Sequence, residues 1–506
     1  MHGMRCLGTL LPVLAFTLVA CGHASPVASG GADATAGAED AGRGRDAGAH
    51  RGDSGHDAHV LADAGDAGVF VGRPGDLGAH SRVIDHSGPD GGSIGPIQHG
   101  AVGTTWQPIG CTATVPVAAG VTGAAWGEDT YGNIDRSPHA VHTSWSADTS
   151  TTLAAIWETD LDTRATFLAY GDSPTKLDHF VQGITFTSPS QPYDILSYPL
   201  LAHEVHVCGL EPSHTYYFAV GGDDWYGNVY AVTTAPPPGS SAPFRFVVTG
   251  DSNFFYQLFA QLSVKMATYA PAWMLFTGDL VHDGPSQQQW EAWFDAGGPL
   301  IATTPTMTAH GNHEEMATAF FALEALPGAE DLYSFDYGNA HFVVLNDTPP
   351  NPDDLTGFEA AFLDSDLTQA EARAVPPTWM ITVHHRPMYC SDPQEGSNLT
   401  VRGAWNAIQQ KHHFYHDFNA HAHNNESTYP IVGDGGIVDA GGTRYITSGG
   451  AGAAFDSPTP TPNPWTVVYY AGLSFGLVDV NGRTLTLQGY RADGTTIETT
   501  PIVIKK

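Results

Sequence analysis

The sequence predicts two folded domains, an all-β sandwich followed by an α/β domain of stacked layers. The chain of 506 residues is longer than one hydrophobic core usually supports. Residues 94–237 consist of short β-type runs with turn residues between them, a pattern typical of a sandwich. Residues 238–506 alternate apolar strand-like runs with amphipathic helical runs, which predicts layers of sheet and helix.

The residues before the first domain carry an export signal. Arg5 precedes an apolar stretch too short to span a bilayer, so residues 1–20 are expected to form a signal peptide. The stretch ends in "LVAC", which resembles a bacterial lipobox and predicts lipidation of Cys21. An ordinary cleaved signal with an incidental cysteine is the alternative. We therefore expect an exported protein of the bacterial cell envelope, lipid-anchored at the outer membrane, in the periplasm or at the cell surface.

Residues 21–93 are expected to form a disordered linker between this anchor and the first domain. The segment is dominated by Ala, Gly and Asp and has few large apolar side chains. It cannot bury enough apolar surface to offset the entropy of ordering. A coil of this kind would reach on the order of 45 Å.

The acidic composition limits the partners of the chain. The formal net charge is −33, which repels phosphate backbones, so nucleic acid is not an expected partner. A small phosphorylated substrate stays compatible with this charge, because bound divalent cations reverse the field locally.

The five cysteines allow one disulfide in the mature protein. Cys6 is removed with the signal peptide and Cys21 is assigned to the lipid. An oxidising compartment then permits one disulfide and one leftover thiol among the remaining three. We favour Cys111 with Cys208, because both fall in the same predicted domain, which leaves Cys390 as the thiol.

The sandwich strands are expected in four stretches. These are "TLAAIWETD", "RATFLAYGD", "HEVHVCGLEPSHTYYFAVGGDD" and "VYAVTTAPPPG". Within the third, "GLEPSHTYYFAV" resembles the end of a fibronectin type III repeat, where a Leu-x-Pro turn precedes a Tyr-rich strand. The Pro-rich "APPPGSSAP" is interpreted as the linker that closes this domain.

Polar residues follow the predicted strands of the second domain. "FRFVVTG" is followed by Asp251, "AWMLFTG" by Asp279, and "TWMITVH" by His385, while Asn312 lies in the turn after "PTMTAHG". Helical periodicity appears in "NFFYQLFAQLSVKMATYA" and "SQQQWEAWFDAG", and "YSFDYGNAHFVVLND" reads as a hairpin. Ligands of α/β folds gather beyond the carboxyl ends of strands, so these side chains are candidate ligands.

Five short stretches carry the predicted chemistry. They are "TGDSN" with Asp251, "TGDLVH" with Asp279 and His282, "HGNHE" with Asn312 and His313, "VHHRPMY" with His385, and "AHAH" with His421 and His423. Taken singly, each is also explained by structure alone, as a turn acid, a capped helix start or a core histidine. Their joint occurrence in this order decides the interpretation.

That order resembles the calcineurin-like metallophosphoesterase superfamily. "LYSFDYGNAHFVVLND" and the preceding fibronectin-like domain narrow the resemblance to the purple acid phosphatase branch, over roughly residues 130–506. The resemblance implies an αββα domain, in which two mixed sheets are flanked by helices and the metals lie at one edge of the sheets.

The resemblance also implies the ligands of a binuclear metal centre. Asp279 would bridge the two ions, the first ion would take Asp251 and His423, and the second would take Asn312, His385 and His421. Carboxylate and imidazole ligands suit Zn, Mn or Fe, as divalent or mixed-valence pairs. Two such ions acidify a bridging water and then clamp the phosphoryl oxygens.

The implied activity is that of an acid phosphatase-like phosphomonoester hydrolase that uses a metal-bridging hydroxide. A phosphodiesterase or nucleotide hydrolase with the same centre is the first alternative. A non-catalytic surface binding lipoprotein is the second. His313 resembles the family histidine that contacts the substrate phosphate and protonates the leaving group, with a role in orienting Asn312 as the alternative.

The chain departs from the family pattern at three places. His282 stands where the purple enzymes have the tyrosine that binds ferric iron, so we expect an imidazole ligand to the first metal and no purple colour; a ring turned toward solvent is the alternative. Ala420 replaces a glycine, which would be costly if the turn needs a positive φ. Asn424 to Ser427 replace a Tyr-Glu-Arg continuation, which alters the rim of the pocket.

Overall fold

The computed structural model describes residues 105–506, apart from short gaps at 117–121, 124–137, 160, 162–165, 189–199, 223–224, 351, 414–415, 440, 456–458 and 460. The predicted signal peptide, the lipidation of Cys21 and the linker over residues 21–93 lie outside the described residues.

The N-terminal part is a β-sandwich of two five-stranded sheets, as predicted. One sheet has the order β3-β8-β9-β5-β4, and the other has β11-β10-β6-β7 with β12 also paired to β10. Their strands, with the β1-β2 pair, are β1 Thr105–Trp106, β2 Val115–Pro116, β3 Thr122–Gly123, β4 His139–Ser144, β5 Thr152–Thr159, β6 Phe167–Gly171, β7 His179–Gln182, β8 Ile184–Thr187, β9 Leu201–Cys208, β10 Thr215–Gly222, β11 Trp225–Tyr226 and β12 Tyr230–Thr233. Trp157, Leu168, Val205 and Phe218 meet in one buried cluster between the sheets.

A disulfide joins Cys111 to Cys208, which confirms the favoured pairing. The two Cα atoms lie 5.2 Å apart and the bridge closes a separation of 97 residues. It ties the segment after β1 to the end of β9. Among the described cysteines, Cys390 is free and buried.

The second part holds two mixed sheets, as predicted. The six-stranded sheet has the order β15-β14-β13-β25-β26-β27, and the seven-stranded sheet has β16-β17-β18-β19-β23-β20-β24. Their strands, with the β21-β22 hairpin, are β13 Phe244–Thr249, β14 Trp273–Phe276, β15 Thr306–Thr308, β16 Tyr333–Tyr337, β17 Ala340–Val344, β18 Trp379–Val383, β19 His416–Asn419, β20 Asn425–Thr428, β21 Ile431–Val432, β22 Gly436–Ile437, β23 Arg444–Ser448, β24 Thr466–Tyr470, β25 Ser474–Asn481, β26 Thr484–Arg491 and β27 Ile502–Lys505.

Aromatic side chains fill the space between these two sheets. The Phe246 ring of β13 stacks on Trp273 of β14 with ring centroids 4.5 Å apart. It also meets Phe342 of β17 and Phe418 of β19 edge-on, at 5.7 and 6.0 Å. All four residues are fully buried. Because these strands are covered on both faces, their sequences read as nearly continuous apolar runs.

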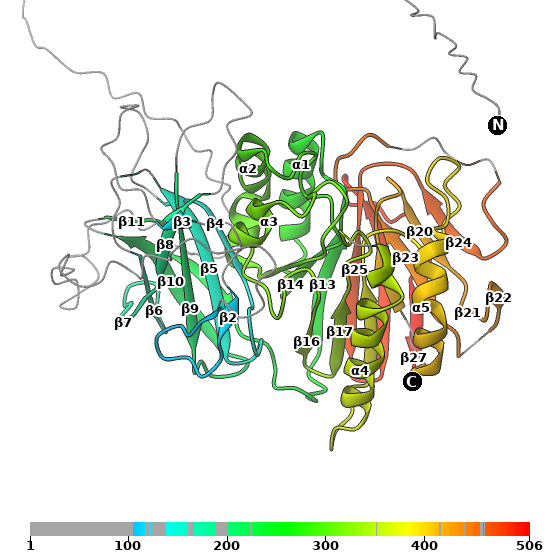
Figure 1. The fold of residues 1–506 in the computed structure, drawn as a ribbon, viewed down its shortest axis with the longest axis horizontal. Coiled ribbons are helices and arrows are strands. Elements are labelled where there is room, and N and C mark those ends of the chain that lie inside the picture. The colour runs from blue at the N-terminus through cyan, green and yellow to red at the C-terminus, as the bar shows by residue number, and fades with distance from the viewer. Residues whose placement is uncertain are drawn as a thin grey trace, which may run out of the picture. The chain divides into compact units, whose positions relative to one another are not determined.

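Helices cover the outer faces of both sheets (Figure 1). They are α1 Tyr256–Ala267, α2 Gln287–Thr303, α3 Thr318–Leu323, α4 Phe358–Glu371 and α5 Leu399–Lys411, with a 3-10 turn at Pro352–Leu355. α1 contacts α2 and β25 of the six-stranded sheet, whereas α4 contacts α5 and β17 of the seven-stranded sheet. No helix in the described part of the chain has both the length and the hydrophobicity that crossing a membrane requires.

One helix is longer than the sequence indicated. The pattern predicted a helix over residues 286–297, but α2 continues to Thr303. Gly298 interrupts it with φ 50° and ψ −143°, and Pro299 follows. A glycine accepts this conformation without steric cost and a proline suits the start of a helical turn, so the chain bends and resumes the helix.

The sandwich docks on the second part through its edge strand β4. The His142 ring stacks on Phe294 of α2 at 4.4 Å, and its Nε2 lies 2.6 Å from the Leu323 carbonyl of α3. Ser144 Oγ donates to the Ala325 carbonyl at 2.7 Å. Paired edge groups of this kind leave the strand protected, and they fix where the sandwich lies on α2 and α3.

Candidate metal centre

The candidate ligands lie in loops that follow parallel strands. β13, β14 and β15 are parallel neighbours in the six-stranded sheet, and β18 and β19 are parallel neighbours in the other. Their carboxyl ends lead to the motif loops, which carry in order Asp251, Asp279, Asn312, His385 and His421. Side chains from five distant stretches thus reach one edge of the two sheets.

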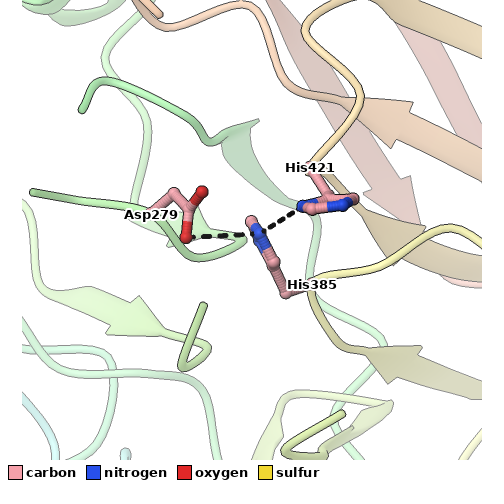
Figure 2. A group of neighbouring side chains, drawn as sticks. All are labelled: Asp279, His385 and His421. Atoms are coloured by element: carbon pink, nitrogen blue, oxygen red, sulfur yellow. Dashed lines mark hydrogen bonds and ion pairs between the residues drawn. The ribbon is translucent and has the colours of Figure 1, made fainter. Parts of the chain in front are cut away.

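Four donor atoms converge on the Nε2 atom of His385 or beside it. Asn312 Oδ1 and His421 Nδ1 each lie 3.2 Å from this nitrogen, and Asp279 Oδ1 lies 3.3 Å from it. The ligand atoms of Asp279, His385 and His421 all lie within 4.8 Å of one another, as Figure 2 shows. His385 Nδ1 donates to the Thr277 carbonyl at 3.0 Å, so in the neutral ring the lone pair of Nε2 faces the cluster.

This geometry fits a cation of the zinc type. Metal–ligand bonds of about 2.0–2.1 Å in tetrahedral arrangement separate the ligand atoms by about 3.3–3.4 Å, which is the spacing seen around Nε2. The donors are two imidazoles, a carboxylate and an amide oxygen, a set that Zn, Mn and Fe accept. Burial alone would lower the pKa of His385, but Asp279 and Asp251 raise it to about 10. The pocket therefore favours positive charge.

The other three predicted ligands occupy the adjoining loops. Asp251 is buried, and its carbonyl accepts from Ala453 N–H at 2.7 Å. The next residue, Ala454, accepts from His423 Nδ1 at 2.6 Å, so one loop holds both candidates for the first ion. His282 packs its ring on Phe254 at 4.0 Å. The structure thus brings Asp279 together with three donors in direct contact, while these residues surround the group from the side.

His313 lies beside Asp279 rather than within the donor group. Its backbone N–H donates to Asp279 Oδ1 at 3.0 Å, and its Nδ1 donates to the His282 carbonyl at 2.8 Å. Its Nε2 lies 3.9 Å from Asp279 Oδ2. The ring is partly exposed, so Nε2 can meet both the cluster and a molecule that enters from solvent.

Comparisons with known proteins agree with this geometry. Residues 138–234 match the family described as purple acid phosphatase, N-terminal domain, and residues 244–425 match calcineurin-like phosphoesterase. Together the two matched ranges cover more than half of the chain. The chain belongs to the calcineurin-like metallophosphoesterases, in the purple acid phosphatase-like branch. This family implies a binuclear metal centre in a domain of the observed architecture.

Individual relatives support the assignment. Purple acid phosphatase 18 of Arabidopsis thaliana is 25% identical over 369 residues, which is 69% of this chain and 79% of the relative. Acid phosphatase type 7 of Mus musculus is 28% identical over 200 residues, which is 34% of this chain and 45% of that relative. The solved structure of purple acid phosphatase PPD1 from yellow lupin (Lupinus luteus) seeds has a TM-score of 0.63 at 19% identity, with 73% of this chain and 74% of that chain covered.

The family turn that carries alanine in this chain is not strained at the alanine. The left-handed residue is His421, with φ 66°, and not Ala420. Our expectation of a cost at Ala420 is therefore wrong. A Cβ on Gly250 would lie 2.9 Å from the Ala420 Cβ, so the glycine opposite provides the space that the alanine uses. Asp251 and Asp279 also have left-handed φ, of 60° and 54°, and strained backbone of this kind clusters at functional sites.

Glu314 holds the bridging acid of the family motif in place, a role that the sequence did not indicate. Its carboxylate accepts from four backbone N–H groups, those of Asp279 (3.0 Å), Leu280 (2.8 Å), Val281 (3.3 Å) and Gly311 (2.7 Å). Gly311 is required here, because a Cβ would come within 2.2 Å of Asp279 Oδ1. The signal available in the sequence was the glutamate of Gly-Asn-His-Glu, which also reads as an ordinary helix cap.

Two further carboxylates orient the imidazoles and were also missed. Glu395 Oε2 lies 3.1 Å from His421 Nε2 and thereby turns Nδ1 toward the cluster. His384, which we expected to pack beside the ligand, is fully buried with its two nitrogens 3.0 Å from Asp347 and Asp417. This buried chain of charges fixes the backbone on which His385 stands.

The Glu314 contacts generate a prediction. Glu314→Gln replaces one acceptor oxygen by an amide that donates and would face backbone N–H groups, so the Asp279 loop loses its position. We expect a loss of about 10–100-fold in metal affinity or activity, measured by competition with a chelator and by phosphatase assay. Glu315→Gln, at the exposed neighbour, is the matched control and should keep both. Equal losses in the two variants would contradict the role of Glu314.

Proposed function

We propose that the chain hydrolyses small phosphate monoesters with a pair of metal ions held by the Asp279 cluster. The observation that carries the proposal is the convergence of four donor atoms, from four separate loops, at ligand-to-ligand spacing. A family relationship to acid phosphatases supports the same reaction.

When bound, the ions supply a nucleophilic water at neutral pH and neutralise the phosphoryl oxygens. The residues of the chain prepare this chemistry. Asp279 presents Oδ1 to the His385 side of the site and Oδ2 toward Asn253 Nδ2 at 3.4 Å and His313. Its carboxylate is thus placed to serve two ions. His385 and His421 are fixed in one orientation by the Thr277 carbonyl and Glu395, so little reorganisation accompanies binding.

His313 is the group placed to donate a proton to the leaving alcohol. The Nδ1 contact to the His282 carbonyl holds the ring, and Nε2 is the atom left for the substrate. A side chain within hydrogen-bond reach of the leaving oxygen contributes as a general acid without any further rearrangement. Orientation of the Asn312 loop through its backbone is the alternative role.

The metals of the proposed pair are Zn, Mn or Fe. His282, in the position of the family tyrosine, completes the first site with Asp251 and His423. A neutral imidazole favours a divalent ion over Fe³⁺, whereas a phenolate favours Fe³⁺. This preference sets the protein apart from the coloured members of the family.

The proposed location is the bacterial envelope, reached by export and kept there by a lipid on Cys21. The Cys111–Cys208 disulfide supports export, because such bonds persist in oxidising compartments. A phosphatase there would act on substrates outside the cytoplasm.

Asn312→Ala tests the proposed function. The change removes one donor of the second ion, so we expect about one metal ion fewer per chain and a loss of turnover of at least about 100-fold. Elemental analysis and hydrolysis of a phosphomonoester and a bis-ester measure the two effects. Asn481→Ala, at an exposed hairpin position, is the control. Near-normal turnover in Asn312→Ala would refute the ligand assignment, and faster hydrolysis of the bis-ester would favour the phosphodiesterase.

The His282 position generates a spectroscopic prediction. Protein reconstituted with iron should lack a strong visible charge-transfer band, and His282→Tyr should gain one, because the phenolate then binds Fe³⁺. Absorption spectra of the two proteins at equal iron content make the comparison. A strong band in the unmodified protein would show that some tyrosine other than the family residue binds iron, contrary to the assignment of His282.

A further inference from the structure

A second group of metal-type donors lies where the sandwich meets α2. His139 on β4, Glu158 on β5 and Glu291 on α2 place one ring nitrogen and two carboxylate oxygens within 4.8 Å of one another. His139 and Glu158 are direct partners across the β4–β5 pair, so both side chains project from the same face of the sheet. Glu291 reaches this face from the helix. The three residues belong to none of the phosphoesterase motifs.

Glu158 is the group that demands a partner. It is 1% exposed, and its buried Oε1 has no hydrogen-bond partner among the described residues. The buried Oε1 of Glu291 and the Nε2 of His139 lack a hydrogen bond in the same way. The nearest approach to an ion pair in the group is His139 Nε2 to Glu291 Oε2, at 3.6 Å. Buried carboxylates are paired with cations or coordinate metals, and this pair has only one imidazole between the two acids.

We propose that these three side chains bind a divalent cation of the zinc type. One imidazole and two carboxylates are a set of three protein ligands that leaves a fourth position for water, as in open zinc sites. The 3.6 Å separation of His139 Nε2 and Glu291 Oε2 is close to the spacing of about 3.3–3.4 Å in a tetrahedral site. Ca²⁺ would require six or more oxygens, which this group does not offer.

The site is open to solvent on one side. The side chains of His139 and Glu291 are 33% and 21% exposed, while Glu158 forms the buried floor. An ion can therefore enter from solvent and lose only part of its hydration. A β-bulge between His139 and His142 shifts the register of β4 and turns this end of the strand toward the helix.

The cation would fasten the sandwich to the helix that also supports the catalytic loop. Two residues before Glu291, the Oε1 atom of Gln289 accepts the backbone N–H groups of His282 and Asp283 at 2.7 and 3.0 Å. α2 thus connects the second group of donors to the loop of the first. This places the sandwich, through the ion, in a positioning role for His282.

A shared proton is the competing occupant. Without a cation, burial and the charge of Glu158 raise the pKa of Glu291, so the two carboxyls would hold a proton between them. The two occupants differ in metal content and in their response to added Zn²⁺, and both differences can be measured on the full chain.

The test compares Glu291→Gln and His139→Gln with Asp295→Asn, which removes an exposed charge one turn further along α2. After saturation with Zn²⁺ and removal of loosely held metal, the first two variants should carry one ion fewer per chain than the unmodified protein. Asp295→Asn should carry the same number. Added Zn²⁺ should raise the unfolding midpoint by about 2–4 °C more in the unmodified protein than in Glu291→Gln.

Equal metal content in the unmodified protein and Glu291→Gln would overturn the proposal and leave the shared proton. If the variants do not fold, crystals of the unmodified protein soaked in Zn²⁺ decide the matter. An anomalous peak among the three side chains supports the site, and its absence overturns it. The difference of one ion does not depend on how many the Asp279 cluster holds, so failure of the proposed phosphatase activity would be recognised separately.

Discussion

The buried carboxylate of Asp279 is the constraint around which the site is arranged. Burial alone would raise the pKa of this acid, but the charges of His385 and His313 lower it, so it stays ionised. The carboxylate of Glu314 lies directly behind it and is satisfied by four backbone N–H groups. Two acids at one buried point repel each other unless positive charge compensates. The surrounding imidazoles provide part of that compensation, and a bound cation provides the rest.

The architecture explains how distant residues reach this point. Parallel strands of both sheets end at the same edge, and each contributes one short loop with a polar residue. The aromatic layer around Phe246 and Trp273 holds the two sheets together, which fixes the loops relative to each other. Left-handed φ values at Asp251, Asp279 and His421 show that the loops are strained where they present their side chains. Rigid strands with strained loops are a means of preorganising ligands before the ion arrives.

Much of this arrangement could be predicted from the sequence, because it depends on local patterns. Strand ends, the Gly-Asp turns and the disulfide follow from periodicity, motif order and cysteine count. The role of Glu314 could not be predicted, because its partners are backbone groups from two loops. Nor could the continuation of α2 past Gly298, where one glycine conformation decides between ending and bending. The group of His139, Glu158 and Glu291 depends on a bulge and an interdomain contact, neither of which has a sequence signature.

The most direct test of the central claim is a measurement of the separation between metal ions in metal-replete protein. X-ray absorption spectroscopy at the Zn or Mn edge reports this distance. The account predicts a metal–metal vector of about 3.5–4 Å with nitrogen and oxygen ligands, since one carboxylate would hold both ions. That vector should disappear in Asp279→Ala. A saturated protein without any metal neighbour at that distance would contradict the account, because the site would then hold a single ion.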